Sequence, residues 1–521
     1  MPDEAQNARP AVNPWIVAVS VMFATFMEVM DTTVVNVSLP HIAGSLSASV
    51  NEATWTLTSY LVSNAIVLPM TGWLANTFGR KRLLMMSVTG FTLSSLVCGL
   101  APTLPVLVFT RIIQGAAGGT LQPLSQSILL EAFRPQDRGK AMGFWGLGIV
   151  VAPIMGPVLG GWLTDQYSWR WVFFINIPVG IASLAMTKAF VFDPPYIGKD
   201  RKRIDYWGLG MLALGVGALQ ILLDKGQNED WFQSKLITAL AVISVCAIVI
   251  LIFRELKARD PVVDLQVFRK RTYSAGVFLM TTLGFVLYGS LVLVPILMQT
   301  LLGYSAFEAG IAMAPRGMGS FLMMPVVGIL VGKFDPRKLL AMGFTLCAFS
   351  LYQLSVLNMN AGYWDFFWPQ FIQGLSLALL FVPLTTTTMD PISNEKMGNA
   401  TSIFNLLRNI GGSMGIAAAT TYTTRHQQQL INVFGEHVNP YSPVARQAAD
   451  QIQSQLMARG SDAFTAAQQT HGVLFGLVQQ QAALVSFMNA FFLLALVFLC
   501  VLPILLMMKR PEGIRGGPPM H

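Results

Sequence analysis

The stretch GWLANTFGRKRLL at residues 72–84 occurs a second time, in altered form, as GILVGKFDPRKLL at residues 328–340. The two stretches align without gaps at an offset of 256 positions. A second pair, RIIQG at 111–115 and QFIQG at 370–374, follows in the same order at an offset of 259. The chain is therefore predicted to consist of two parallel copies of one structural unit.

Composition places these copies in a membrane. Of the 521 residues, 53% are hydrophobic and 12% are charged, about half of the roughly 25% found in soluble proteins. Apolar runs of about 20 residues, the length that a helix needs to cross a bilayer, recur along the whole chain. The net charge of +8 could indicate a nucleic-acid-binding protein, but the basic residues lie in short clusters between apolar runs. This pattern is typical of membrane topology and argues against a nucleic-acid partner.

Fourteen apolar runs are expected to form membrane-spanning helices. Basic residues fall in alternate connections, as in GRKR at 79–82 and KDRKR at 199–203. Because cytoplasmic loops carry an excess of Lys and Arg, this alternation predicts that both termini face the cytoplasm. The expected helices are 15–37, 53–75, 83–101, 104–130, 139–162, 169–190, 206–223, 236–254, 273–299, 306–332, 338–357, 364–389, 397–423 and 483–508.

The repeat also predicts how these helices are grouped. It lies between the second and third helices of each copy, which gives two six-helix halves at 15–190 and 273–508. A pair of helices at 205–254 is inserted between them. Residues 1–14 and 509–521 are expected to be a cytoplasmic N-terminus and a cytoplasmic tail. The predicted fold class is thus an all-α integral membrane protein with two six-helix halves and two inserted helices.

One connection is unusually long. Residues 424–481, between the last two expected helices, contain twelve glutamines and are expected to form a long periplasmic loop. The composition around QAADQIQSQLMARG, at 447–460, indicates short amphipathic helices in it. A solvated loop without a specific role is the alternative. Since long loops in compact proteins are usually functional, we favour a docking surface.

The first apolar run contains two acids, in FMEVMDTTVVNVSLP at 26–40. An acid in the middle of a membrane helix costs roughly 2.5–3.5 kcal/mol on insertion scales. Glu28 and Asp31 are three positions apart and therefore share one helix face. Two close carboxylates resist simultaneous ionisation, which suits a site that takes up and releases a proton. Either acid serving only a structural role is the alternative.

Arg111 lies inside another expected helix, at 104–130. An Arg within the membrane needs a partner, and Asp31 is the natural candidate in the same half. If a proton and Arg111 compete for Asp31, the pair can act as a two-state switch. A structural ion pair without coupling is the alternative. Arg316 and Arg408 also fall inside expected spans, where each is either a functional or a buried structural cation.

Several motifs resemble a known family. GWLANTFGRKRLL at 72–84 is similar to the loop between helices 2 and 3 of the major facilitator superfamily. LVFTRIIQGAAGG at 107–119 resembles its helix-4 motif, and GIVVAPIMGPVLGG at 148–161 resembles its helix-5 antiporter motif. MDTTVVNVSLP at 30–40 resembles the first helix of the fourteen-span drug/proton antiporters. The resemblance extends over residues 12–510 with the motifs in the family's order.

A finer resemblance, to EmrB-type multidrug efflux transporters, is carried by WPQFIQG at 368–374, PLTTTT at 383–388 and VNPYSP at 438–443. It implies alternating-access export of hydrophobic drugs or uncouplers, with the proton gradient as energy source and no cofactor. It also implies a multi-pass protein of the bacterial inner membrane and a role in antibiotic resistance. A periplasmic adaptor and an outer-membrane channel are the implied partners in a tripartite efflux system.

These patterns nominate three groups of site residues. Asp31, Glu28 and Arg111 are the expected proton-coupling residues. Polar and aromatic side chains are expected to line the substrate pocket: Gln114, Trp55, Tyr60, Trp145, Tyr288, Gln373, Phe404 and Arg408. Packing between helices is the alternative role for these side chains. The expected gating residues are Gly72, Asn76, Gly79, Arg80, Gly156, Pro157, Gly160 and Gly161.

The loop motif departs from the family at one position. Asn76 stands where the family usually has an acid, which is thought to help latch the two halves together on the cytoplasmic side. Asn can donate and accept hydrogen bonds but has no charge. The latch is therefore expected to be weaker, or to be assisted by Asp335 of the second copy.

Other functions are less well supported by the sequence. The five histidines have no metal-ligand spacing, and no Walker A loop indicates direct use of ATP. The hydrolase-like pattern GGSMG at 411–415 falls in an expected helix, where close packing explains it. Two alternatives to multidrug efflux stay open: a dedicated exporter of one metabolite or siderophore-like compound, and a membrane enzyme or sensor on a transporter scaffold.

Overall fold

The computed structural model describes residues 13–134, 136–193, 205–258, 261–439 and 441–508. All regular elements in these ranges are helices. The predicted N-terminal segment up to residue 12, the basic cluster at 199–203 and the tail at 509–521 lie outside the described residues.

The N-terminal half follows the expected helices, several of which are interrupted. Pro69 lies in a short 3-10 turn, η2 (Leu68–Met70), which interrupts the second expected helix. Gly79, with φ of +86°, ends that helix in a conformation that favours glycine. The elements are α1 (Pro14–Ser45), α2 (Val50–Ala53), α3 (Trp55–Val67), α4 (Thr71–Phe78), α5 (Arg80–Gly99), α6 (Leu104–Gly118), α7 (Leu121–Ala132), α8 (Arg138–Gln166), α9 (Trp171–Phe174) and α10 (Asn176–Phe190).

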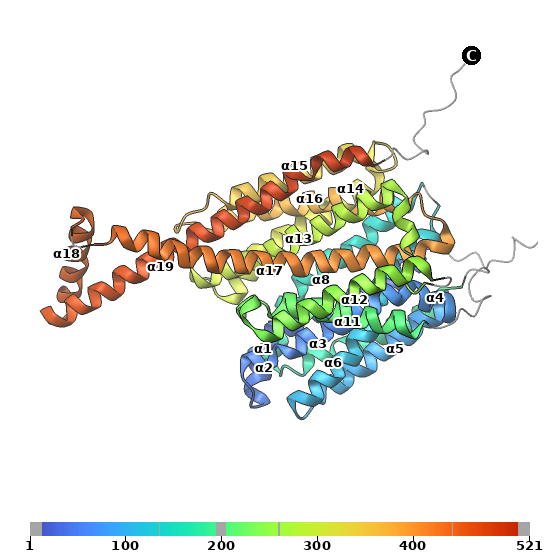
Figure 1. The fold of residues 1–521 in the computed structure, drawn as a ribbon, viewed down its shortest axis with the longest axis horizontal. Coiled ribbons are helices and arrows are strands. Elements are labelled where there is room, and N and C mark those ends of the chain that lie inside the picture. The colour runs from blue at the N-terminus through green and yellow to red at the C-terminus, as the bar shows by residue number, and fades with distance from the viewer. Residues whose placement is uncertain (1–12, 135, 194–204, 259–260, 440, 509–521) are drawn as a thin grey trace, which may run out of the picture.

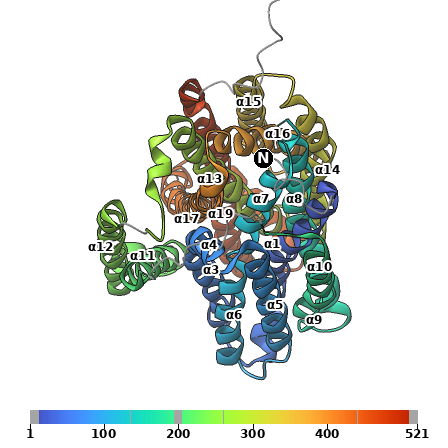
Figure 2. The ribbon, with the colours of Figure 1, turned by 90° about the vertical axis from the view of Figure 1, so that its right-hand side faces the viewer.

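The inserted pair and the C-terminal half contain longer, mostly continuous helices (Figure 1). The inserted helices are α11 (Tyr206–Lys225) and α12 (Lys235–Lys257), and they lie outside the two halves in Figure 2. The C-terminal half consists of α13 (Arg271–Thr300), α14 (Ala306–Leu330), α15 (Pro336–Leu354), α16 (Tyr363–Met389), α17 (Met397–His437), α18 (Pro443–Ala458) and α19 (Ala463–Cys500).

The helices provide enough apolar length for a polytopic membrane protein. Within the described residues, ten helical stretches are long and apolar enough to span a bilayer, and the bent α8 makes eleven. The other expected spans correspond to α3 with α4, to α15 and to α17, which are helical but more polar. The all-helical fold class is confirmed, whereas the count of fourteen spans stays a prediction.

The segment expected to be a loop, 424–481, is mostly helical. α18 is one of the short helices that the composition predicts, but α17 continues to His437 and α19 begins at Ala463. The expected helix boundaries at 423 and 483 are therefore wrong. Long helices persist here because the polar residues beyond the apolar run include good helix formers, with no proline before Pro440. Together these pieces project from the body as an extension (Figure 1).

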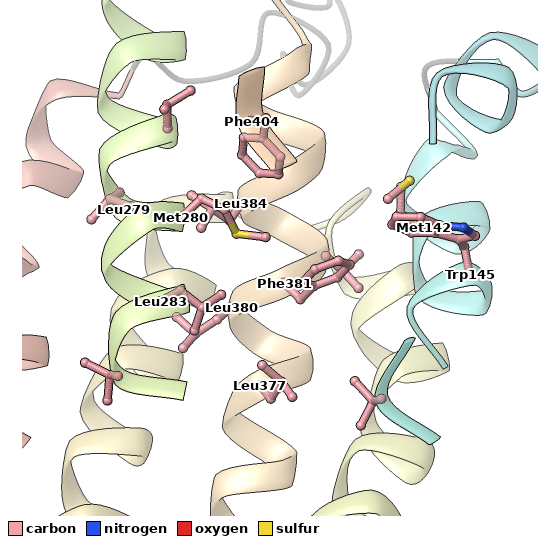
Figure 3. Packing of buried hydrophobic residues seen from close by; sticks show 14 of the residues in the cluster. Met142, Trp145, Leu279, Met280, Leu283, Leu377, Leu380, Phe381, Leu384 and Phe404 are labelled. Atoms are coloured by element: carbon pink, nitrogen blue, oxygen red, sulfur yellow. The ribbon is translucent and has the colours of Figure 1, made fainter. Parts of the chain in front are cut away.

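The two halves touch at the end of the molecule where α5 and α8 begin, which we call the basic end. A Cβ atom built on Gly143 of α8 would lie only 2.8 Å from the carbonyl oxygen of Met324 in α14. Next to this contact, Trp145 faces Phe381 of α16, with ring centroids 6.1 Å apart (Figure 3). The halves are therefore packed together at the basic end in this structure.

The inserted pair contacts both halves. Lys225 of α11 donates a hydrogen bond to Thr54 beside α3 at 2.5 Å. Gln220, on the same helix, donates to Ser413 of α17 at 2.8 Å. α11 thus lies along the seam between the halves, on the outside of the bundle (Figure 2).

Candidate functional site

A fully buried ion pair occupies the interior of the N-terminal half. Arg111 of α6 donates from Nη1 to Oδ2 of Asp31 in α1 at 2.5 Å, and both side chains have no exposed surface. Gln114 accepts from the same Arg111 nitrogen at 2.8 Å and donates to Asp31 Oδ1 at 3.2 Å. The expected pairing of Asp31 with Arg111 is thus present, and Gln114 closes a ring of three side chains.

Neighbouring helices complete the surroundings of this pair. Asn176 of α10 donates to Asp31 Oδ1 at 2.7 Å. Arg111 Nε donates to the carbonyl of Thr56 at 3.1 Å, and the guanidinium lies 4.2 Å from the ring centre of Tyr60. Tyr60 therefore supports the cation through its aromatic face. Asn176 was not predicted, since an isolated amide in an apolar run has no spacing signature.

Glu28 belongs to a different cluster, although it shares a helix with Asp31. Asn64 of α3 donates to Glu28 Oε1 at 3.1 Å, and Gln122 of α7 donates to Oε2 at 2.6 Å. The carbonyl oxygen of the Gln122 side chain in turn accepts from Arg408 of α17. Because Arg408 belongs to the C-terminal half, Gln122 connects Glu28 to the opposite half. Neither Asn64 nor Gln122 was predicted from the sequence.

More polar contacts join α7 to α17 at the same seam. Asn405 donates to Gln126 at 2.6 Å, and Thr401 donates to the carbonyl of Pro123 at 3.2 Å. The seam between the halves near Glu28 is therefore held by hydrogen bonds as well as by apolar packing.

The C-terminal half contains a comparable cluster without an acid. Arg316 of α14 donates from Nη2 to Ser290 of α13 at 3.1 Å and to the side-chain oxygen of Gln373 in α16. Gln373 also donates to Ser290 at 3.3 Å. Arg316 is 4% exposed. Gln373, one of the residues expected in the substrate pocket, lies inside this cluster.

The aromatic pocket candidates are in dissimilar places. Trp145 and Phe404 are fully buried in the apolar core that joins the halves (Figure 3). Tyr288 is half-buried beside Gly412, where a Cβ would lie 2.6 Å from its ring. Trp55 is 41% exposed and lies near Lys225, with the ammonium 5.1 Å from its ring centre. The structure thus brings Trp145 and Phe404 to one region and leaves Trp55 outside it.

The motif around residue 76 forms part of the contact at the basic end. A Cβ on Gly72 would lie 2.6 Å from the backbone nitrogen of Asn399, so α4 and α17 approach backbone to backbone. Arg80 is buried and forms an ion pair with Glu131 of α7. Arg80 also donates to the carbonyl of Asn394 in the opposite half at 3.3 Å. Charge pairing at this latch therefore involves Glu131, while Asn76 itself is only half-buried.

Of the α8 glycines expected to act in gating, two lie in close contact with α1 and one does not. A Cβ on Gly156 would lie 1.9 Å from Thr33 Oγ1, and one on Gly160 would lie 2.9 Å from the carbonyl of Val34. Both therefore let α8 pack against α1 within the N-terminal half, next to Asp31. Gly161 has more room, with its nearest neighbour 4.0 Å away. Pro157 lies in α8, and its side chain is outside the described residues.

Comparison with known proteins agrees with this architecture. The family model described as the Major Facilitator Superfamily matches residues 21–416. This chain belongs to the Major Facilitator Superfamily. Its fold resembles the crystal structure of the human organic anion transporter MFSD10 (TETRAN), with a TM-score of 0.60 at 12% identity, covering 94% of this chain and 100% of that one. At that identity the likeness concerns the fold alone.

Three curated relatives match nearly the full length. The chain is 37% identical over 503 residues to the multidrug export protein EmrB of Escherichia coli, and 39% identical over 500 residues to EmrB of Haemophilus influenzae, with 96% of each chain covered. It is 36% identical over 502 residues to the fatty acid resistance protein FarB of Neisseria gonorrhoeae, covering 96% of this chain and 97% of that one. The resemblance to EmrB-type proteins is thus confirmed, and the chain is a multi-pass membrane transporter rather than an enzyme.

Proposed function

We propose that this transporter exports hydrophobic small molecules of several kinds in exchange for protons, as the inner-membrane pump of an efflux system. Its similarity to proteins named for multidrug export supports the substrate class. The observation that carries the proposal is the set of two buried acids on one helix, Asp31 held by Arg111 and Glu28 held by an amide that reaches the opposite half.

The two acids are proposed to have different parts in coupling. Protonating Asp31 removes the charge that compensates Arg111, which frees the guanidinium to change partners. Protonating Glu28 converts one oxygen from an acceptor to a donor, which weakens its bond from Gln122 and so the bridge to Arg408. Asp31 is thereby proposed as the proton carrier, and Glu28 as the group that links protonation to the contact between the halves.

Alternating access is proposed to act on the packed seam. The apolar side chains around Trp145, Phe381 and Phe404 fill the contact between the halves at the basic end (Figure 3). If the halves separate there, the same side chains become the walls of a cavity open to that side. Such walls, with a few polar groups nearby, suit flat hydrophobic substrates better than polar ones.

A transport assay tests this proposal. The purified protein in proteoliposomes is expected to drive a cationic dye against its gradient when a pH gradient is imposed and to stop when the gradient is dissipated. In cells, efflux is expected to collapse when the proton gradient is abolished while ATP is maintained. Continued efflux under that condition would point to another energy source.

The assay also separates multidrug export from the narrower alternative. The relative named for fatty acid resistance favours testing acidic amphiphiles beside cationic dyes and neutral drugs. Export of several chemical classes is expected. Export of a single compound would identify a dedicated exporter instead.

The helical extension is proposed to dock a periplasmic adaptor, which would in turn contact an outer-membrane channel. It projects from the end opposite the basic end (Figure 1) and carries exposed apolar side chains outside the span-forming part of the bundle. Tyr441 is 89% exposed, Val444 is 77% exposed and Phe464 is 72% exposed. Exposed apolar groups on a polar extension are typical of a surface that binds another protein.

A further inference from the structure

Arg316, a buried cation of α14, has no acid paired with it among the described residues. Arg316 takes part in none of the ion pairs formed by the described residues, and its hydrogen bonds go to the neutral side chains of Ser290 and Gln373. Two of its nitrogens, Nε and Nη1, are buried without a hydrogen-bond partner. A buried cation left in this way is unfavourable, which indicates that a partner is missing from this conformation.

The N-terminal half shows which partner that is. Ser290 and Gln373 each lie 259 positions after Asp31 and Gln114, which is the offset of the RIIQG repeat. The hydrogen bonds correspond as well. Arg111 donates to Gln114 and to Asp31 of α1. Arg316 donates to Gln373 and to Ser290 of α13. The two clusters differ in two ways. Arg316 comes from α14 and not from the repeat position of Arg111, and Ser290 supplies a hydroxyl where Asp31 supplies a carboxylate.

A second buried group near this cluster is also without partners. Gln370 is fully buried one helical turn before Gln373 on α16, and both polar atoms of its amide lack a hydrogen bond. It occupies the repeat position of Arg111. Arg316 of α14 and Gln370 of α16 thus both have N–H donors without a hydrogen-bond partner. A cation and free N–H donors are the groups that bind an anion.

We propose that Arg316 binds the anionic group, a carboxylate or phenolate, of acidic amphiphilic substrates during export. This inference rests on the proposed transport function and specifies a subsite for one class of its substrates. The substrate's charge takes the place that Asp31 has in the N-terminal half. A cationic or neutral substrate gains nothing from Arg316, so the subsite separates substrate classes.

The surroundings suit the remainder of such a molecule. Leu377 lies one turn beyond Gln373 on α16, and Leu283 lies two turns before Ser290 on α13. Both belong to the apolar group that continues through Leu380 to Phe381 at the seam (Figure 3). When the halves separate at the basic end, this group offers an apolar surface that leads to Arg316. An acidic head with a hydrophobic tail matches that order of groups.

The decisive experiment supplies the missing carboxylate from the protein itself. In Ser290→Asp the new side chain pairs with Arg316, so an acidic substrate meets a neutralised site. In proteoliposomes, the ratio of export of a fluorescent long-chain carboxylate to export of a cationic dye is expected to fall about tenfold, the loss of one charge-assisted contact. Arg316→Gln is expected to lower the ratio similarly. Thr300→Asp, at the exposed end of the same helix, adds the same charge away from the site and is the control.

A binding measurement keeps the test independent of transport. In detergent, the long-chain carboxylate is expected to raise the unfolding temperature of the unmodified protein and of Thr300→Asp, but not of Ser290→Asp or Arg316→Gln. Ser290→Asp itself is expected to be more stable than the unmodified protein because it neutralises a buried charge. If it fails to fold, Arg316→Gln still provides the test.

Two results would overturn the proposal. The first is an unchanged ratio of carboxylate to dye export in both variants, whether export of the two substrates is unaffected or is lost equally. The second is stabilisation by chloride alone, which would identify the bound anion as a free inorganic ion. Failure of the transport proposal looks different, since the unmodified protein would then export neither substrate under a pH gradient.

Discussion

Each half of this transporter contains a ring of an Arg, a Gln and a residue of its first helix, but only one of the two rings is electrically balanced. The Gln and the first-helix residue occupy the same repeat positions, whereas the Arg comes from α6 in one half and from α14 in the other. In the N-terminal half Arg111 faces Asp31, and in the C-terminal half Arg316 faces Ser290. Gln114 and Gln373 bridge the two members of each ring in the same way. The hydrogen-bonding frame is therefore shared, and the charge distinguishes the halves.

This difference indicates a division of labour between the halves. A carboxylate opposite an Arg can be neutralised by a proton, which is what coupling requires. A hydroxyl opposite an Arg leaves a positive site that a proton cannot switch but an anion can fill. The N-terminal half is thus suited to the driving ion, and the C-terminal half is suited to the substrate.

The largest effect on stability and transport is expected when the N-terminal ring loses its acid, so that Arg111 is left without a counter-charge as Arg316 is. Asp31→Asn keeps the shape of the side chain but leaves Arg111 without its counter-charge, which costs about 3–5 kcal/mol in a buried pair. We expect a lower unfolding temperature and loss of transport driven by a pH gradient. Thermal unfolding in detergent and dye transport in proteoliposomes measure the two effects.

The double variant Asp31→Asn with Arg111→Gln separates these effects. It removes both charges, so stability should largely recover while proton-driven transport stays absent. Proton-driven transport at the original rate in Asp31→Asn would contradict the assignment of Asp31 as proton carrier.

The next largest effect on stability and transport is expected when a side chain is added at the close contact between α8 and α1. Gly156→Ala places a methyl group where Thr33 lies, two positions after Asp31, and overpacking of this kind costs about 1–3 kcal/mol. Gly415 of α17 is the matched control, because it lies 259 positions later and its Cβ would lie 1.9 Å from the carbonyl of Phe285. Both alanine variants should be destabilised. Only Gly156→Ala is expected to change the pH dependence of transport, since it displaces the helix that carries both acids.

A smaller effect on transport is expected at the bridge between the halves. Gln122→Ala removes the amide that joins Glu28 to Arg408 and with it two hydrogen bonds to charged side chains, each of which contributes about 1.5–3 kcal/mol. The ratio of transport driven by a pH gradient to downhill transport of the same dye should fall. Gln126→Ala removes another α7–α17 bond, to Asn405, without touching an acid, and should leave this ratio unchanged. Equal ratios in the two variants would remove Glu28 from the coupling mechanism.

The sequence predicted much of this arrangement because its main signals are periodic or repeated. The copies at 72–84 and 328–340 predict two related halves, and membership of the superfamily confirms that organisation. The pairing of Asp31 with Arg111 was predictable because two buried opposite charges in one half have few other partners.

The contacts of the amides were not predictable in the same way. Asn64, Gln122 and Asn176 lie on three different helices, and only the packing of those helices brings them to the acids. The asymmetry at Ser290 was likewise hidden, because a serine in an apolar helix is unremarkable until a buried Arg is placed beside it. Hydropathy also marks where a helix leaves the lipid, not where it ends, which explains the boundaries missed in α17 and α19.

The extension is a further difference between the halves, and its removal is expected to have the smallest effect on transport. In the N-terminal half the connection between α8 and α9 is only a short turn, whereas α17 and α19 of the C-terminal half are joined through α18. Replacing residues 443–458 by a short flexible linker removes α18 and no residue of either polar ring. Dye transport in proteoliposomes should be unchanged, while capture of a co-expressed periplasmic adaptor should weaken. Full adaptor capture by this variant would exclude α18 from the docking surface and leave the adjoining ends of α17 and α19 to be tested. Lost transport would instead mean that the extension helps to hold α17 and α19 in place.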